Sequence, residues 1–308
     1  MAKVQFIEVA FEYAGQRLDN FLLRELKGVP KARIYRALRK GEVRVNKGRA
    51  KADYRLQQGD IVRVPPIQTA PQSAPATVPA RWSSLLEDAT LFAGPGLWIL
   101  NKPSGLAVHG GSGLAIGLIE CLRQLAPEEQ FLELVHRLDR DTSGCIMVAR
   151  KAATLKTLHA ALREDGVDKR YLALVAGHWP DGRKRIEAPL QKNTLKSGER
   201  MVRVAATGKP SLTEFTVVER FAEATLIEAR PITGRTHQIR VHAQQAGHAI
   251  LGDEKYTDDA AQALTKKLGL KRLFLHAHSI SAALDDLHFS VAAPLESSLE
   301  DLLERLRE

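Results

Sequence analysis

A proline-rich stretch divides the chain and limits what it can fold into. Residues 65–79 hold five of the 14 prolines, no charged side chain, and otherwise small, polar or aliphatic residues. Proline fixes the backbone angle φ and lacks an amide hydrogen, so such a stretch favours an extended, polyproline-type conformation. We therefore expect a linker here, with separately folded domains on its two sides.

The positive charge of the chain is concentrated on one side of this linker. The chain has 45 Lys and Arg against 36 Asp and Glu, and residues 16–64 alone contain 14 basic and 5 acidic residues. The whole excess of nine positive charges lies in this segment, and the remaining residues balance. A small basic unit beside a neutral larger one suggests a nucleic-acid-binding module, although a merely solvated basic surface has the same composition.

Composition excludes several protein classes. With 44% hydrophobic and 26% charged residues, 308 residues are enough for two domains with apolar cores, and general disorder is excluded. Two cysteines, Cys121 and Cys145, cannot form a disulfide framework or a cysteine-based zinc site, which favours a reducing compartment. No apolar run approaches the roughly 20 residues that span a bilayer, and the N-terminus lacks a signal-peptide core. We expect a cytoplasmic protein that makes no membrane contact.

Residues 16–64 predict two short helices and a small sheet. Leucines at helical spacing predict a first helix from Leu18 to Leu26, and Pro30 begins a second helix that Gly41 ends. Strands are predicted at residues 3–13, 43–45 and 61–64. The expected module is a small α/β domain.

Beyond the linker, short apolar runs bounded by turn residues predict strands. They lie at residues 97–100, 145–149, 171–175, 215–218, 225–229 and 273–275. Helical patterns come between and after them, at residues 114–125, 152–163, 236–245 and 295–306. Strands outnumber helices and vary in spacing, which favours an α+β fold with a mostly antiparallel mixed sheet over regular βαβ winding.

Cofactor motifs are not found in the sequence. There is no phosphate-binding Gly-x-x-x-x-Gly-Lys-Ser/Thr loop, and Gly110-Gly111-Ser112-Gly113 lacks the spacing of a dinucleotide fingerprint. The ten histidines include two close pairs, His237/His242 and His276/His278, without the helix motif or carboxylates of a metal site. We expect neither a nucleotide cofactor nor a metal.

The densest polar cluster is residues 136–144, which lead into the predicted strand 145–149. Arginines at positions 137 and 140 flank Asp139. Nearby positive charge favours the ionised carboxylate, which can then act as a nucleophile or a base. An ion-paired turn whose polar side chains bond backbone amides explains the cluster equally well.

Two further segments are candidates for the same site. In residues 234–242, Gly234 and Thr236 are suited to open a helix, and Arg240 follows one turn later between two apolar residues, where it could pair with a buried carboxylate. A solvated amphipathic helix is the alternative. Tyr171 begins a predicted strand, and by itself it is typical of a core or edge tyrosine.

In this order along the chain, the motifs resemble the RluA family of pseudouridine synthases. The resemblance rests on residues 100–105, 136–144, 169–171 and 234–242, and it extends to residues 28–31, 39–46, 108–113 and 275–277, so it covers nearly the whole chain. It implies a pseudouridine synthase catalytic domain preceded by a small RNA-binding module of the kind found in a small-subunit ribosomal protein. We place this module at residues 16–64, the linker at 65–82 and the catalytic domain at 83–308.

The resemblance implies a cofactor-free isomerisation of uridine to pseudouridine, in which the glycosidic bond is broken and the turned uracil is rejoined through carbon. Asp139 matches the essential carboxylate, which acts on the ribose either as a nucleophile or as a base. Arg240 matches the arginine that pairs with it. Tyr171 matches the tyrosine that stacks near the uracil and moves the proton from its carbon.

The resemblance also implies how RNA is bound. A uridine inside folded RNA must be flipped out, and Arg137 matches the residue that fills the vacated place, while His136 and Leu275 match pocket-lining positions. The basic module offers these cations to RNA: Lys31, Arg33, Arg36, Arg39, Lys40 and Arg44. The expected partner is 23S ribosomal RNA, and the expected oligomeric state is a monomer.

Three alternatives differ in substrate or in chemistry. They are the same reaction on other ribosomal or transfer-RNA uridines, an RNA-binding ribosome-assembly factor without catalysis, and a glycosidase that uses Asp139 and Asp141 as its two carboxylates. Two departures from the family pattern, residues 92–96 and Thr257, lie outside the reacting cluster. They affect loop geometry rather than the predicted chemistry.

Overall fold

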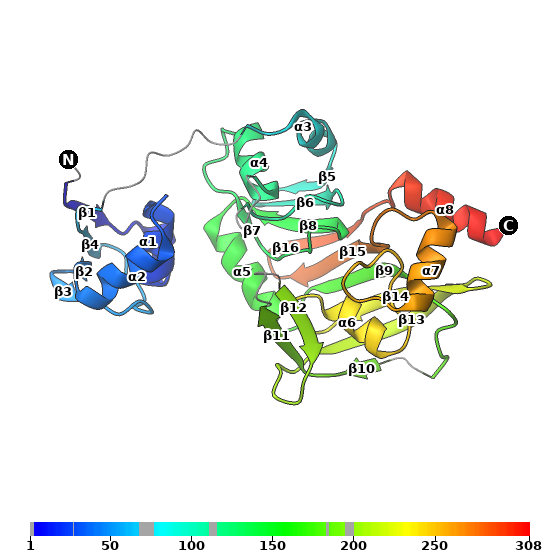
Figure 1. The fold of residues 1–308 in the computed structure, drawn as a ribbon. Coiled ribbons are helices and arrows are strands. Elements are labelled where there is room, and N and C mark those ends of the chain that lie inside the picture. The colour runs from blue at the N-terminus through cyan, green and yellow to red at the C-terminus, as the bar shows by residue number, and fades with distance from the viewer. Residues whose placement is uncertain (1–2, 27, 68–76, 111–115, 183–184, 195–199) are drawn as a thin grey trace. The chain divides into compact units, whose positions relative to one another are not determined.

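The chain folds into two compact units, residues 1–77 and 78–308 (Figure 1). The structure is a computed structural model that describes residues 3–26, 28–67, 77–110, 116–182, 185–194 and 200–308. Residues 68–76, half of the segment predicted to be the linker, lie outside the described residues. Each unit is therefore considered by itself.

The first unit consists of a small antiparallel sheet and two α-helices. Its elements are β1 (Gln5–Glu8), the 3-10 helix η1 (Phe11–Tyr13), α1 (Leu18–Glu25), α2 (Lys31–Lys40), β2 (Arg44–Val45), β3 (Gly48–Arg49) and β4 (Ile61–Val64). The sheet order is β1-β4-β2-β3. Leu22 and Ile34 from the helices pack with Val62 and Val64 of the sheet in one buried cluster. Both helices therefore use their apolar faces to cover the same side of the sheet.

The predictions for this unit hold except at its beginning. The strand expected over residues 3–13 ends at Glu8 and is followed by η1. The amide of Val9 donates to the carbonyl oxygen of Asp60, and the amide of Gly59 donates to the carbonyl oxygen of Val9. These two hydrogen bonds close a loop instead of extending the strand pairing. Helix α2 ends where predicted, since Gly41 adopts a φ of 69° that suits glycine.

The second unit contains most of the secondary structure. Its helices are α3 (Ala80–Glu87), α4 (Leu118–Leu125), α5 (Ala152–Arg163), α6 (Gln238–Gln245), α7 (Asp259–Leu268) and α8 (Ser297–Arg307). Its strands are β5 (Thr90–Gly94), β6 (Leu97–Lys102), β7 (Glu133–Leu134), β8 (Ser143–Ala149), β9 (Asp168–Ala176), β10 (Arg185–Glu187), β11 (Leu190–Thr194), β12 (Arg200–Val204), β13 (Leu212–Arg220), β14 (Ala224–Pro231), β15 (Leu275–Leu284) and β16 (Leu287–Ala292).

Within the described residues a ten-stranded sheet organises this unit. Its main order is β10-β13-β14-β9-β15-β8-β6-β5, with β16 beside β15 and β7 beside β8, while β11 and β12 form a separate pair. The pairs are antiparallel except β8 with β15, which run parallel. The predicted mostly antiparallel α+β fold is therefore confirmed. Gly144 makes the parallel contact possible, because it has a φ of 105° and a Cβ there would lie 2.3 Å from the carbonyl oxygen of Ala277.

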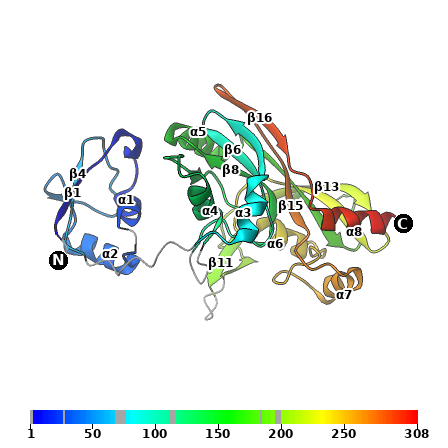
Figure 2. The same cartoon turned by 90° about the horizontal axis from the view of Figure 1, so that it is seen from above.

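The large sheet is buried on both faces. Ala173 and Val175 of β9 belong to a cluster that includes α5, whereas Leu174, between them, belongs to a cluster with α7 and α8. Alternate residues of a strand point to opposite faces, so the two clusters lie on opposite sides of the sheet. In both views α5 lies far from α7 and α8 (Figures 1 and 2). Because the sheet is packed on both faces, its strands are fixed, and so are the polar residues at or next to their ends, such as Lys102 at the end of β6.

Several predicted boundaries in this unit were wrong. The strand predicted at residues 273–275 begins only at Leu275 and runs to Leu284, because its polar residues pair with β9 and β16. The helix predicted from Thr236 begins at Gln238, after His237 in a left-handed conformation with φ 54°. Helix α3 begins at Ala80, directly after Pro79, and so starts within the segment assigned to the linker. A search of the described residues finds no helix that could span a membrane.

Candidate active site

Asp139 lies on the loop between β7 and β8. Lys102, the last residue of β6, forms a hydrogen bond to the backbone of this loop. The ammonium group of Lys102 is fully buried and donates hydrogen bonds to the carbonyl oxygens of Pro103, Leu106 and Arg140 at 2.8, 2.8 and 3.0 Å. The amide of Gly105 also bonds the Arg140 carbonyl. Burial lowers the pKa of Lys102 to about 7. The Asn-Lys-Pro-Ser-Gly motif is therefore a support that fixes the backbone next to Asp139.

Arg240 of α6 joins Asp139 to a second carboxylate. Its Nη1 donates to Asp139 Oδ2 at 3.0 Å, while Nε and Nη2 donate to the two oxygens of Asp253 at 2.7 and 2.8 Å. Asp253 is fully buried, whereas the Asp139 side chain is 26% exposed. Burial by itself lowers the pKa of Arg240, but the two carboxylates outweigh it and raise that pKa. Arg240 therefore stays charged, and one carboxylate of the three-residue group remains open to a ligand.

A tight turn after Gly252 places Asp253 beneath Arg240. Gly252 has a φ of 76°, and a Cβ there would lie 1.9 Å from the carbonyl oxygen of Arg272. Asp253 Oδ1 also accepts hydrogen bonds from the amides of Lys255 and Tyr256 at 2.8 and 3.0 Å. These contacts fix the Asp253 carboxylate before any substrate binds, so the orientation of Arg240 is set by the fold.

His237 approaches the other oxygen of Asp139. Its Nε2 lies 3.8 Å from Asp139 Oδ1, and its Nδ1 shares a 2.7 Å hydrogen bond with the hydroxyl of Tyr256. The same hydroxyl accepts the amide of Val202 at 2.8 Å. Burial lowers the pKa of His237, although the charge of Asp139 acts in the opposite direction. His237 is thus neutral at neutral pH, and its ring closes one side of the carboxylate.

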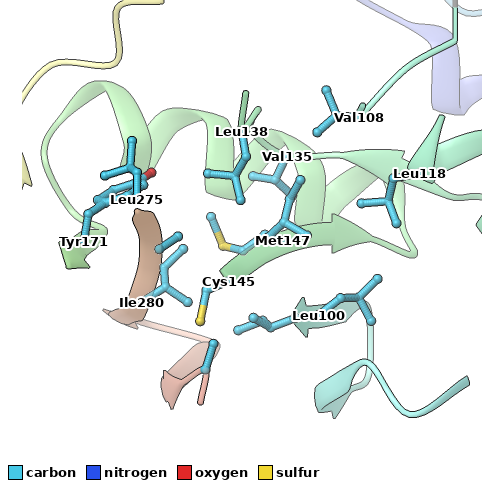
Figure 3. Close-up of a cluster of buried hydrophobic side chains, with 14 of the residues drawn as sticks. Leu100, Val108, Leu118, Val135, Leu138, Cys145, Met147, Tyr171, Leu275 and Ile280 are labelled. Carbon is cyan, nitrogen blue, oxygen red and sulfur yellow. The ribbon is translucent and has the colours of Figure 1, made fainter. Parts of the chain in front are cut away.

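Tyr171 lies at the border between the site and the core. It starts the buried part of β9 and is only 9% exposed, in the same cluster as Leu275 and Cys145 (Figure 3). Burial raises the pKa of Tyr171, and the negative charge of Asp139 raises it further. The tyrosine is therefore a neutral phenol. Leu275 is 3% exposed and packs in this cluster, so the two residues form an apolar wall.

The two residues before Asp139 have different environments. His136 Nε2 accepts a hydrogen bond from the amide of Met147 at 3.1 Å, and burial lowers the pKa of His136 to about 3. The buried His136 ring therefore links the Asp139 loop to the backbone of β8. Arg137 is exposed, and no described residue forms an ion pair or a hydrogen bond with its side chain. Its guanidinium is therefore free to meet a ligand.

A cleft of about 1520 Å³ opens behind the site. Arg240, Asp253 and Lys102 line it, as do residues of α3, α7 and α8, but Asp139 and Tyr171 do not. The cleft therefore borders the Arg240–Asp253 pair that supports Asp139 and not Asp139 itself.

The predicted cations of the first unit divide between two faces. Lys31, Arg36, Arg39 and Lys40 are exposed on α2, and Arg33 pairs with Glu42 at 2.8 Å. Arg44 instead belongs to β2, and the next residue, Val45, is buried. Neighbouring residues of a strand point to opposite faces, so the Arg44 side chain projects from the face of the sheet that the helices do not cover. The six cations, predicted to form one group, therefore lie on two elements and face two sides of the unit.

The structure thus brings Asp139, Arg240 and Tyr171 into one region, as the sequence interpretation required. Three residues of this region were not predicted: Asp253, His237 and Tyr256. The sequence does contain a signal for Asp253. An aspartate directly after a glycine is typical of a tight turn, in which its carboxylate accepts hydrogen bonds from backbone amides two or three residues later.

Comparisons with known proteins define the class. Residues 96–245 match the family model described as RNA pseudouridylate synthase, and residues 16–62 match the S4 domain. The fold resembles that of human RNA pseudouridylate synthase domain containing 4, with a TM-score of 0.62 and 26% identity over 74% of this chain and 96% of that one. The human domain containing 1 gives a TM-score of 0.57, also at 26% identity, over 71% and 94%. The fold and the matched family models are those of an RNA pseudouridine synthase with an S4 domain.

Similarity over the full length is closer still. A protein of Haemophilus ducreyi named ribosomal large subunit pseudouridine synthase C is 54% identical over 99% of this chain and 97% of its own. The protein of the same name from Escherichia coli K12 is 52% identical, with the same coverage of both chains. The chain belongs to this family of RNA pseudouridine synthases, which confirms the family predicted from the motifs.

Proposed function

We propose that the chain converts specific uridines of large-subunit ribosomal RNA, the 23S RNA of bacteria, to pseudouridine, with Asp139 as the essential carboxylate. The observation that carries the proposal is the Arg240 bridge, in which a buried carboxylate holds the arginine and leaves Asp139 partly exposed. A second support is the naming of full-length relatives after the large ribosomal subunit. Uridine and pseudouridine are isomers, so the reaction consumes no oxidant, reductant or second substrate.

The proposed reaction begins at the ribose of a flipped-out uridine. Asp139 attacks the ribose or removes a proton from it, and the bond between C1′ and N1 of uracil breaks. The uracil turns, and C5 bonds to C1′ as the bond between Asp139 and C1′ breaks or, in the other route, as the abstracted proton returns to the ribose. The proton then leaves C5 and N1 gains a proton, so that Asp139 is regenerated and the product is an isomer of uridine. Tyr171, a neutral phenol beside this space, is our candidate for positioning the uracil and moving that proton.

We infer that Arg137 fills the place of the flipped nucleotide. It is exposed, lies two residues before Asp139, and has no side-chain partner among the described residues. His136 and Leu275 act from behind, by fixing the loop and forming the apolar wall. We further propose that the chain acts as a monomer in the cytoplasm, where ribosomes are assembled.

The test is to map pseudouridines in ribosomal RNA from a strain that lacks the gene. Carbodiimide labelling and primer extension should show specific large-subunit positions losing the modification. The unaltered gene should restore them, and the Asp139→Asn gene should not. Restoration by the variant would contradict the role of Asp139. Losses confined to transfer RNA would contradict the ribosomal substrate but not the chemistry.

A further inference from the structure

The outer face of the sheet in the first unit carries an exposed aromatic ring in line with three arginines. Phe6 of β1 lies opposite Arg63 of β4, Arg63 lies opposite Arg44 of β2, and Arg44 lies opposite Arg49 of β3. We call these four residues the Phe6 row. Because paired strands are about 4.8 Å apart, the row spans about 14 Å, across all the strands of this sheet (Figure 1).

This face is the one that the helices leave uncovered. Val62 and Val64, on either side of Arg63, are at most 1% exposed and pack against the helices, whereas Phe6 is 68% exposed. Phe6 therefore makes little use of its ring in folding the unit. An aromatic ring that the core does not need is a candidate for binding.

Among the described residues, no carboxylate forms an ion pair with an arginine of the Phe6 row. Arg63 Nη1 donates to the carbonyl oxygen of Glu42 at 2.8 Å, and Arg44 Nε lies 3.4 Å from that of Gly41. The Glu42 side chain is paired with Arg33 instead. Carbonyl oxygens orient a guanidinium but leave its charge in place, so three positive charges extend in a line from the Phe6 ring across the sheet. Glu8, opposite Ile61, is the acidic strand residue on this face.

We propose that the Phe6 row binds single-stranded RNA, with a base stacked on the Phe6 ring and the neighbouring phosphates held by the three arginines. The inference rests on the proposed function, since it assumes that RNA is the ligand. Every base has a π-face, so stacking on an aromatic side chain tolerates any sequence, and arginines follow the backbone. A base-paired helix does not present its base faces, so it would not use the ring.

The proposed partner explains both parts of the row. An apolar protein segment would match Phe6 and Ile61 but would leave three arginines without counter-charges. A purely electrostatic contact would match the arginines but would not need Phe6. The cations of α2 lie on a different face, so the row adds a contact for unpaired nucleotides to the one that α2 offers to phosphates.

The experiment compares binding of two RNA probes to the full chain. A labelled oligouridine and a labelled RNA duplex of equal length are titrated, with fluorescence anisotropy as the readout. Phe6→Ala should raise the Kd for the oligouridine by about 5- to 150-fold, the range for loss of one stacking aromatic, and should leave the Kd for the duplex within about twofold.

Matched variants separate stacking from apolar contact. Phe6→Leu keeps an apolar side chain but removes the π-face, so it should bind the oligouridine as poorly as Phe6→Ala, and Phe6→Trp should bind as well as the unaltered chain. Phe11→Ala removes another exposed phenylalanine, 75% exposed on η1, and should change nothing. Circular dichroism of each variant confirms that the unit is folded.

Three outcomes would overturn the proposal. They are unchanged oligouridine binding by Phe6→Ala, full binding by Phe6→Leu, and a self-association of the unaltered chain that Phe6→Ala abolishes, which would assign the face to a second copy. The proposed function fails separately, if the unaltered chain forms no pseudouridine in ribosomal RNA.

Discussion

The two units carry different kinds of titratable group, and this difference separates binding from chemistry. The first unit holds the basic excess but no histidine, while all ten histidines, both cysteines and all three tryptophans lie in the second unit, whose charges nearly balance. Phosphate binding by exposed cations depends on salt, whereas buried histidines and carboxylates respond to pH. RNA affinity should therefore follow salt through the first unit, and folding of the site should follow pH through the second.

The largest expected effect is the loss of turnover in Asp139→Asn. Removing the carboxylate should lower the rate of pseudouridine formation by about 10³-fold or more, because no other group would act on the ribose. RNA affinity should remain within about threefold, since one partly exposed carboxylate is all that changes. Single-turnover assays and anisotropy measure the two quantities. Asp141→Asn is the control, because Asp141 makes an exposed ion pair with Arg140, and equal loss in both variants would refute a special role for Asp139.

Asp253→Asn should give the next largest effect, on stability. It removes the carboxylate that binds both Nε and Nη2 of Arg240 and leaves a buried charge poorly compensated, so the free energy of unfolding should fall by about 3–5 kcal/mol. Tryptophan fluorescence in urea reports the second unit alone. Glu219→Gln, which breaks a surface pair with Arg307, should cost less than about 1 kcal/mol. Similar costs for the two variants would show that the Arg240 bridge does not stabilise the fold.

The second unit should also lose stability as the pH falls. His276 is fully buried, and burial lowers its pKa to about 4, against about 6.5 in an unfolded chain. Between these values the unfolded chain binds a proton at His276 that the folded chain does not, so His276 by itself lowers the free energy of unfolding by about 1.4 kcal/mol per pH unit between pH 6.5 and pH 4. His276→Gln should reduce this slope in tryptophan-detected unfolding, and replacing the exposed His288 should not. Identical slopes would contradict the burial argument.

The sequence allowed prediction where local pattern decides the structure. Helix α5 and strand β4 have the predicted bounds, because their apolar spacing and end signals are contained within a few residues. The positions of Asp139, Tyr171 and Arg240 came from family motifs, not from local pattern. Asp253 was missed because its function depends on a tertiary contact, across 13 residues, that the turn at Gly252 creates. The Phe6 row was missed for a similar reason, since strand register brings its members together.

The smallest expected effect tests the division between the units most directly. Lys31, Arg36, Arg39 and Lys40, the exposed cations of α2, are replaced together by Gln. RNA affinity and single-turnover rate at saturating RNA are then measured from low to high salt. The salt slope of the affinity should become shallower by up to about 3, with the turnover rate within about twofold. An unchanged salt slope, or a turnover rate that falls with the charges, would contradict the separation of RNA binding from the Asp139 site.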